Sequence, residues 1–151
     1  MNIFYRLILI VGIVGSTQTL AKESMVYSGS YEADIKTVNA ANNVNLTIVV
    51  WEGYDRNFEI TLTDIDVPEA FEDAPDCHIQ LMADAMKFTK KFLRNAEELK
   101  VYGIRMEDSA KKYGTAEIKS EKAMLSKELL KKGFARSNTI ANETPWCEDE
   151  K

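Results

Sequence analysis

The sequence predicts an α+β fold, mainly β, in which five strands form a Greek-key barrel and about two helices pack against it. Three observations indicate this fold. Apolar and polar residues alternate in short segments, a longer segment repeats its apolar residues at helical spacing, and strand-like segments occur on both sides of that helix. The predicted order of elements is β-β-β-α-β-β-α.

A meander of three strands is expected first. Residues 31–38 alternate Tyr31, Ala33 and Ile35 with charged residues, which is typical of a half-buried strand. The same period recurs in the next two segments, and turn-forming residues separate the three. The predicted strands are residues 31–38, 44–50 and 58–63, with turns at 39–43 and 52–57.

A long amphipathic helix is predicted at about residues 79–99. It follows an acidic loop in which Pro68 and Pro75 cannot donate a backbone hydrogen bond to a sheet. The apolar positions recur at spacings of four, three, four, four and three residues, which places them on one face of a helix. These positions are Leu81, Ala85, Phe88, Phe92, Ala96 and Leu99.

The remaining elements complete the predicted barrel. Residues 100–106 and 115–119 are expected to be strands, and residues 123–132 a second helix that ends at Gly133. Three meander strands, a helix and two further strands suit a five-stranded barrel of the oligonucleotide/oligosaccharide-binding (OB) type, with a helix covering one end. Neither a linker nor an internal repeat divides the sequence, so we expect one domain.

The first 21 residues are predicted to be a secretory signal peptide. Residues 7–14 are apolar but too few to span a bilayer as a helix, and small residues precede a cleavage site after Ala21. Cleavage would leave residues 22–151 as a single secreted or periplasmic domain without stable membrane insertion. An uncleaved anchor is the alternative, because Arg6 is the single positive charge before the apolar stretch.

The mature chain is expected to be acidic. The whole sequence has 19 basic and 24 acidic residues, a net charge of −5, and loss of Arg6 with the signal peptide makes the net charge −6. Nonspecific binding to a phosphate backbone depends on a basic surface. The composition therefore argues against a general nucleic-acid-binding protein and leaves room only for a local site.

Two cysteines, Cys77 and Cys147, are expected to form one intramolecular disulfide, because exported proteins fold in an oxidising compartment. The bridge would connect the C-terminal tail to the loop before the first helix. Two free thiols or a metal pair are the alternative, although the sequence has no CxxC motif and His78 is its single histidine. We expect His78 to lie on the surface.

Three motifs resemble the staphylococcal nuclease-like (thermonuclease) family. The strand at 58–63 leads into Asp66-Val67-Pro68-Glu69, which resembles that family's strand ending in Asp-x-Pro-Glu. Lys111-Lys112-Tyr113-Gly114 resembles its Tyr-Gly-Arg turn, and residues 129–135 resemble its helix ending in a Gly-Phe/Leu-Ala step. The motifs occur in the family's order between about residues 31 and 136, and the resemblance implies the same barrel fold.

The resemblance also implies the chemistry of a calcium-dependent nuclease that hydrolyses DNA or RNA. In such a site oxygen ligands hold Ca²⁺, a glutamate activates water, and two arginines neutralise charge that develops on the phosphoryl group. Asp66 matches a calcium carboxylate, the Val67 carbonyl a backbone ligand, and Glu69 the general base. Asn42 stands where the other calcium carboxylate is expected, so we predict no cofactor, or weakly bound calcium.

The two arginine positions of the family are occupied by Thr61 and Thr115, which carry no charge. Loss of one preorganised donor to a developing oxyanion typically costs a factor of about 10² to 10³ in rate. We therefore expect a catalytically degenerate domain that acts by binding a protein partner.

Two other functions stay open. In an active nuclease with a rearranged site, charge would come from new positions, which could be Arg56, Arg105, Lys111 or Lys112. In a nucleic-acid-binding module without catalysis, aromatic residues would stack on bases. The lysines of the second helix are most simply a solvated face, but they would form a local nucleic-acid site if they lined a groove. These lysines are Lys122, Lys127, Lys131 and Lys132.

Overall fold

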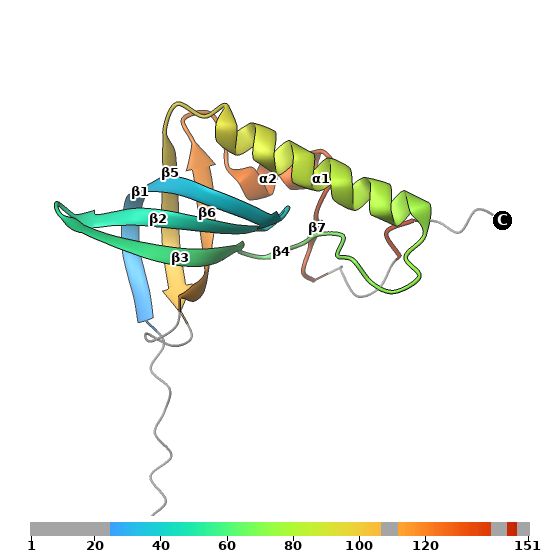
Figure 1. Cartoon of the computed structure of the whole chain (residues 1–151), viewed down its shortest axis with the longest axis horizontal. Helices are drawn as coiled ribbons and strands as arrows, with labels where there is room; N and C mark the ends of the chain where they lie inside the picture. The colour runs from blue at the N-terminus through green and yellow to red at the C-terminus, as the bar shows by residue number, and fades with distance from the viewer. Residues whose placement is uncertain (1–24, 107–111, 140–144, 148–151) are drawn as a thin grey trace, which may run out of the picture.

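The computed structural model describes residues 25–106, 112–139 and 145–147, so the predicted signal peptide lies outside the described residues (Figure 1). The described chain is α+β and mainly β, with a five-stranded mixed sheet and two helices. Its elements are β1 (Met25–Ala40), β2 (Asn43–Trp51), β3 (Tyr54–Leu62), β4 (Ile65–Asp66), α1 (Asp76–Arg94), β5 (Leu99–Met106), β6 (Tyr113–Ser120), α2 (Leu125–Lys131) and β7 (Arg136–Ser137). The predicted order of strands and helices is confirmed, with two short strands, β4 and β7, in addition.

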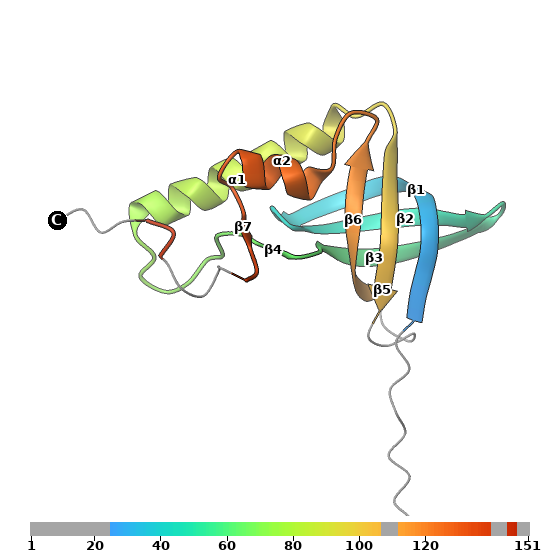
Figure 2. The same cartoon turned by 180° about the vertical axis from the view of Figure 1, so that it is seen from behind.

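The five long strands form a closed barrel in the order β1-β2-β3-β6-β5, because β5 pairs back with β1. The neighbouring pairs are antiparallel except β3–β6, which is parallel. A parallel pair needs a long crossover connection, which α1 and β5 provide here. Figures 1 and 2 show α1 and α2 together on one side of the barrel and the β2–β3 hairpin projecting away from them.

Alternation along β2 and β3 decides which side chains fill the barrel. Val44, Leu46 and Ile48 of β2 and Ile60 of β3 are buried, whereas the residues that alternate with them are only half-buried and face outward. Burying an aliphatic side chain of this size contributes about 1.5–3 kcal/mol. The period-2 pattern predicted for these two strands is thereby confirmed, and with it the assignment of their inner and outer faces.

Helix α1 begins three residues earlier and ends five residues earlier than predicted. At its start, the Pro75 carbonyl accepts hydrogen bonds from the backbone N–H groups of His78 and Ile79. At its end, Leu99 belongs to β5, where it pairs with Ser120, so the helix must stop before it. Of the described helices, neither is long and apolar enough to cross a membrane.

The face that α1 turns toward the barrel differs from the predicted apolar face. Its buried residues include Ala85, Thr89 and Leu93, and the Thr89 hydroxyl donates a hydrogen bond to the Ala41 carbonyl at 2.8 Å. That bond satisfies a polar group inside the core. Phe88 and Phe92 of the predicted stripe are only half-buried. The helix is therefore rotated so that these two rings lie at the edge of its packed face.

Several strands begin earlier than predicted because of their pairing. β3 begins at Tyr54, which pairs with Trp51 of β2, so the turn predicted at 52–57 is much shorter. β1 begins at Met25 rather than at Tyr31, since its first residues pair with β5 from Met25 opposite Met106 onward. β3 ends at Leu62, before the acidic loop, and the short strand β4 pairs antiparallel with β7 in a separate two-stranded sheet, Asp66 opposite Arg136.

The predicted disulfide is present between Cys77 and Cys147, whose Cα atoms are 6.4 Å apart. It connects the tail to the second residue of α1 rather than to the loop before the helix. The Arg136 guanidinium lies 4.0 Å from the centre of the Trp146 ring and donates a hydrogen bond to the Pro145 carbonyl at 2.6 Å. The disulfide and Arg136 together fix residues 145–147 against α1 and β7.

Candidate functional site

The two positions at which the resemblance expects arginines lie side by side. Thr61 on β3 and Thr115 on β6 are direct partners in the parallel β3–β6 pair. Neighbouring strands are about 4.8 Å apart. Their chain neighbours Leu62 and Ala116 are buried in the barrel. Because side chains alternate along a strand, Thr61 and Thr115 share one face on the outside of the barrel.

This face continues as one row across four strands. Asn43 on β2 is the partner of Thr61, and Arg105 on β5 is the partner of Thr115. The Asn43 amide donates a hydrogen bond to the Thr61 hydroxyl at 3.1 Å. We call these four residues the outer row. Thr61 is thus hydrogen-bonded to a neutral amide. Arg105, the one cation of the outer row, lies on the other side of Thr115.

A network of uncharged amides and hydroxyls continues from Asn43. The Asn39 amide donates to the Asn43 side-chain oxygen at 2.8 Å, and the Asn45 amide donates to the Thr37 hydroxyl at 2.8 Å. The Thr37 hydroxyl in turn donates to the Asn39 side-chain oxygen at 3.2 Å. Sequence reasoning missed this network, although the alternation of Asn43, Asn45 and Thr47 with buried residues was the signal for it.

The next outward-facing residue of β3 is Glu59, two positions before Thr61. Its partners across the sheet are Asn45 on β2 and Tyr113 on β6. Tyr113 is 61 % exposed, and it borders a groove of about 480 Å³ together with Glu59 and Lys112. The charged residue of β3 that lies nearest to Thr61 on this face is therefore the acidic Glu59.

The residues expected to bind calcium lie in two segments, the β1–β2 turn and β4 with the residue that follows it. Asn42 lies in the β1–β2 turn, 7 % exposed, and its backbone carbonyl accepts a hydrogen bond from the Leu62 N–H at 2.8 Å. Asp66 lies in β4 opposite Arg136, and Val67 is buried. Among residues 25–106, 112–139 and 145–147, His, Cys, Asp and Glu form no group of three or more that could hold a metal ion.

Glu69, the expected general base, lies exposed in the loop between β4 and α1. A ring nitrogen of His78, Nε2, lies 2.8 Å from the Glu69 backbone oxygen, and the Phe71 ring meets the imidazole edge-on at 4.8 Å between centres. The prediction that His78 lies on the surface is wrong, because it is 5 % exposed. Its spacing of seven and eleven residues from Ala85 and Thr89 was the helical signal that could have placed it inside.

The relocated cations considered from the sequence differ in where they lie. Arg56 is in phase with buried Phe58 on β3, and its guanidinium lies over the Phe58 ring at 5.3 Å and donates a hydrogen bond to the Tyr27 hydroxyl. Arg56 therefore faces away from Thr61. Lys111 lies outside the described residues. Arg105 is the candidate that the sheet brings onto the same face, beside Thr115.

Gly114, in the motif that resembles the nuclease turn, is required by close packing of β6 against β5. A Cβ atom at this position would lie 2.9 Å from the Arg105 carbonyl oxygen and 3.3 Å from the Met106 side chain. Real Cβ atoms do not approach a backbone oxygen so closely. Gly114 thus fixes the approach of the two strands that carry Thr115 and Arg105.

A half-buried carboxyl group lies on β6 two residues after Thr115. Burial raises the pKa of Glu117 above its ordinary value of 4.5, and the neighbouring Asp64 carboxylate raises it further, while a hydrogen bond from the Ser126 hydroxyl at 2.6 Å acts in the opposite direction. The folded protein therefore holds this proton more tightly than the unfolded chain. Its contribution to stability is present below about pH 4.5 and is lost as the pH rises through the folded-state pKa.

Replacement of Glu117 by Gln is expected to remove this pH-dependent loss. Relative to the parent, the variant should gain stability between about pH 4 and pH 7, by less than about 1 kcal/mol because solvent screens a half-buried carboxyl. Urea unfolding at several pH values measures the difference. Glu72→Gln, in the exposed loop, is the control. A stability difference for Glu117→Gln that does not change with pH would contradict the assignment.

No family model matches the chain, and no curated protein matches it.

Proposed function

We propose that this protein is a catalytically degenerate staphylococcal nuclease-like domain of the OB type, which acts by binding a protein partner. The strand order β1-β2-β3-β6-β5, with α1 inserted between β3 and β5, supports the OB-type assignment. A secreted or periplasmic location belongs to the same proposal, and the disulfide is compatible with it.

The observation that carries this proposal is the pairing of Thr61 with Thr115 on one outer face. A phosphoryl group that docked there would meet two hydroxyls, one of them already bonded to the Asn43 amide. Hydroxyls cannot neutralise the charge that develops on phosphoryl oxygens as a planar guanidinium does. Glu59, on the same face of β3, would repel the phosphate.

Weak or absent calcium binding is consistent with the same view. Asn42 offers one neutral amide oxygen where a carboxylate is expected, and hard cations such as Ca²⁺ prefer charged oxygen ligands. Asp66, the remaining carboxylate, lies in the short β4–β7 pair, where its partner residue is Arg136. We infer that the chain retains the loop of a metal site with one carboxylate fewer than the family's.

A protein partner fits the surface better than a nucleic acid. The net charge of −5 opposes a general phosphate-binding surface. The β2–β3 hairpin also presents Trp51 and Tyr54 stacked at 4.2 Å, with 61 % and 42 % of their surfaces exposed. The two rings cover one face of each other and form one exposed aromatic patch on the hairpin, and exposed aromatic residues are typical of protein contacts.

A plasmid-nicking assay with calcium tests the proposal. We expect cleavage at least about 10³-fold slower than that of a family nuclease with both arginines, assayed in parallel, because two charge-stabilising donors are missing. Glu69→Ala is the internal control and should not change the residual rate. Brisk cleavage that depends on Glu69 would refute the proposed loss of catalysis.

An active nuclease with a rearranged site is the second candidate, and Arg105 is the observation that favours it. Arg105 is the partner of Thr115 in the β5–β6 pair, so its charge lies one strand away from a catalytic arginine position. If Arg105 substitutes for that arginine, the parent protein cleaves plasmid in the same assay and Arg105→Ala removes the cleavage. Equal, negligible rates for parent and variant support the first proposal.

A further inference from the structure

Helices α1 and α2 leave a groove between them that lies away from the outer row. Its volume is about 650 Å³, and it is bordered by the second half of α1, the turn between β6 and α2, and Phe134 after α2. The pocket lies where Figures 1 and 2 show the two helices side by side. Volumes of this size are sufficient to hold a ligand or a few side chains of a partner.

The floor of the groove is apolar. Phe88 and Phe134 have ring centres 5.6 Å apart, and Phe88 and Phe92 have ring centres 6.4 Å apart. All three rings are half-buried, and Ala96 and Ala123 border them. Phe88, Phe92 and Ala96 belong to the predicted apolar stripe of α1, and Phe134 follows α2, so both helical segments contribute to this floor.

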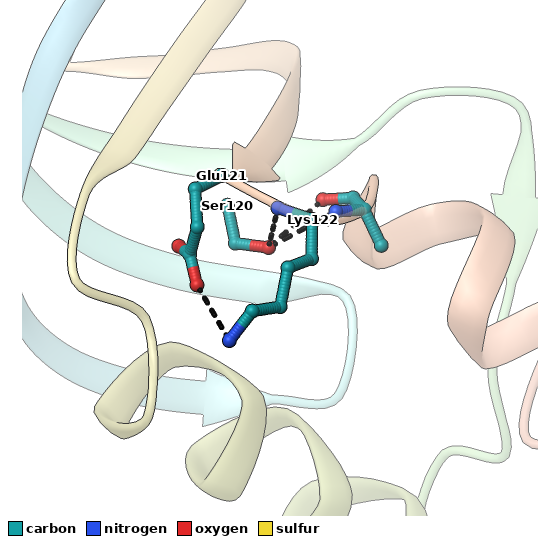
Figure 3. A network of polar contacts seen from close by, with 4 residues as sticks. Ser120, Glu121 and Lys122 are labelled. Atoms are coloured by element: carbon teal, nitrogen blue, oxygen red, sulfur yellow. Dashed lines mark hydrogen bonds and ion pairs between the residues drawn. The ribbon is translucent and has the colours of Figure 1, made fainter.

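The rim of the groove is charged, with one more lysine than carboxylates. Four lysines and three acidic residues border it: Lys87, Lys91, Lys122, Lys132, Asp84, Glu121 and Glu128. Glu121 forms an ion pair with Lys122 at 3.2 Å, beside a turn in which the Ser120 hydroxyl accepts hydrogen bonds from two backbone N–H groups (Figure 3). Lys87, Lys91 and Lys132 form no ion pair with any other described residue.

The wall formed by α1 is elongated. Its contributing residues recur from Asp84 to Phe92 at helical spacings of three and four and continue beyond the helix end to Ala96. From Asp84 to Phe92 the helix rises roughly 12 Å. A partner helix lying along this wall would therefore contact it over two to three turns.

We propose that this groove binds an acidic amphipathic helix of a protein partner, with apolar side chains on the Phe88–Phe92–Phe134 floor and carboxylates beside the rim lysines. Charge complementarity favours this occupant. A protein of net charge −5 repels an acidic segment over most of its surface, but the lysines of the groove rim attract it. Helix-in-groove docking uses apolar anchors at helical spacing, which match an elongated apolar floor. The inference rests on the proposed function in that the protein acts by binding a protein.

Single-stranded nucleic acid is the competing occupant, because lysines and aromatic rings also bind it. Stacking on a base needs an open ring face. Here Phe88 packs against both Phe92 and Phe134, and all three rings are half-buried, so they offer a continuous apolar floor rather than separate stacking surfaces. The geometry of the rings therefore favours apolar side chains over bases.

The test uses the mature protein and a fluorescein-labelled peptide of about 15 residues, with leucines at helical spacing and glutamates elsewhere. We expect saturable binding by fluorescence anisotropy, weakened by salt. The triple variant Lys87→Gln, Lys91→Gln, Lys132→Gln should bind about tenfold more weakly, since three charge contacts of modest strength are removed. In ¹⁵N spectra the shifted amides should include Phe92 and Ala123.

A matched control removes three positive charges that do not border the groove: Lys90→Gln, Arg94→Gln, Lys127→Gln. It should bind the peptide within about twofold of the parent. Equal weakening by both triple variants, or tighter binding of a single-stranded oligonucleotide of about 12 nucleotides, would overturn the proposal. Absence of peptide binding would also overturn it, but would leave the nuclease measurement, and the proposed loss of catalysis, unaffected.

Discussion

Replacing both Cys77 and Cys147 by serine is expected to lower the free energy of unfolding by about 2–4 kcal/mol. The bridge joins residues 70 positions apart, and a cross-link of that span restricts the unfolded chain strongly. It also holds residues 145–147, where Trp146 lies over the Arg136 guanidinium of β7. Equilibrium unfolding in urea measures the loss of stability. The comparison requires that the free energy of unfolding depend on urea concentration with the same slope in both proteins.

The parent protein unfolded under reducing conditions provides the control for this variant. It should unfold at the same urea concentration as the double serine variant, since both lack the cross-link. If the oxidised parent and the double variant unfold together, the bridge contributes no stability and the tail is not fixed by it.

Ile60→Ala is expected to cost about 2–5 kcal/mol, whereas Thr61→Ala should cost about 1 kcal/mol. Ile60 is fully buried in the barrel, so its truncation removes apolar burial and leaves a cavity. Thr61 faces outward and loses chiefly the hydrogen bond from Asn43. Urea unfolding of the two single variants, adjacent in sequence, compares the two faces of β3 directly.

This pair of variants also checks the geometry of the candidate site. A shift of the β3 register by one residue would bury Thr61 and expose Ile60. Equal losses for the two variants, or a larger loss for Thr61→Ala, would contradict the placement of Thr61 on the outer face. The pairing of Thr61 with Thr115 on one outer face would then be wrong as well.

The strands of the meander could be predicted from sequence because their signal is local. Val44, Leu46 and Ile48 alternate with polar residues, and one buried face is enough to produce that pattern. The disulfide was also predictable, since a chain with two cysteines offers one intramolecular pairing. The element order followed from these local patterns.

Features that depend on contacts between distant segments could not be predicted. Helix α1 has more apolar residues than the barrel can cover, and periodicity alone does not show whether Thr89 or Phe88 faces inward. The pairing of β4 with β7 involves two residues on each side, too few for a pattern. The motifs located Thr61 and Thr115 separately. That Thr115 lies between Thr61 and Arg105 follows from the order of strands in the barrel.

The most direct test of the proposed loss of catalysis is a single-turnover cleavage rate. It is measured for the purified protein without residues 1–21, on a labelled single-stranded oligonucleotide in saturating calcium, and compared with the rate of the Glu69→Ala variant. We expect the two rates to be equal and close to the uncatalysed background, because hydroxyls at Thr61 and Thr115 cannot balance the charge of the reacting phosphate. A fast, calcium-dependent rate that Glu69→Ala abolishes would contradict this account of the site.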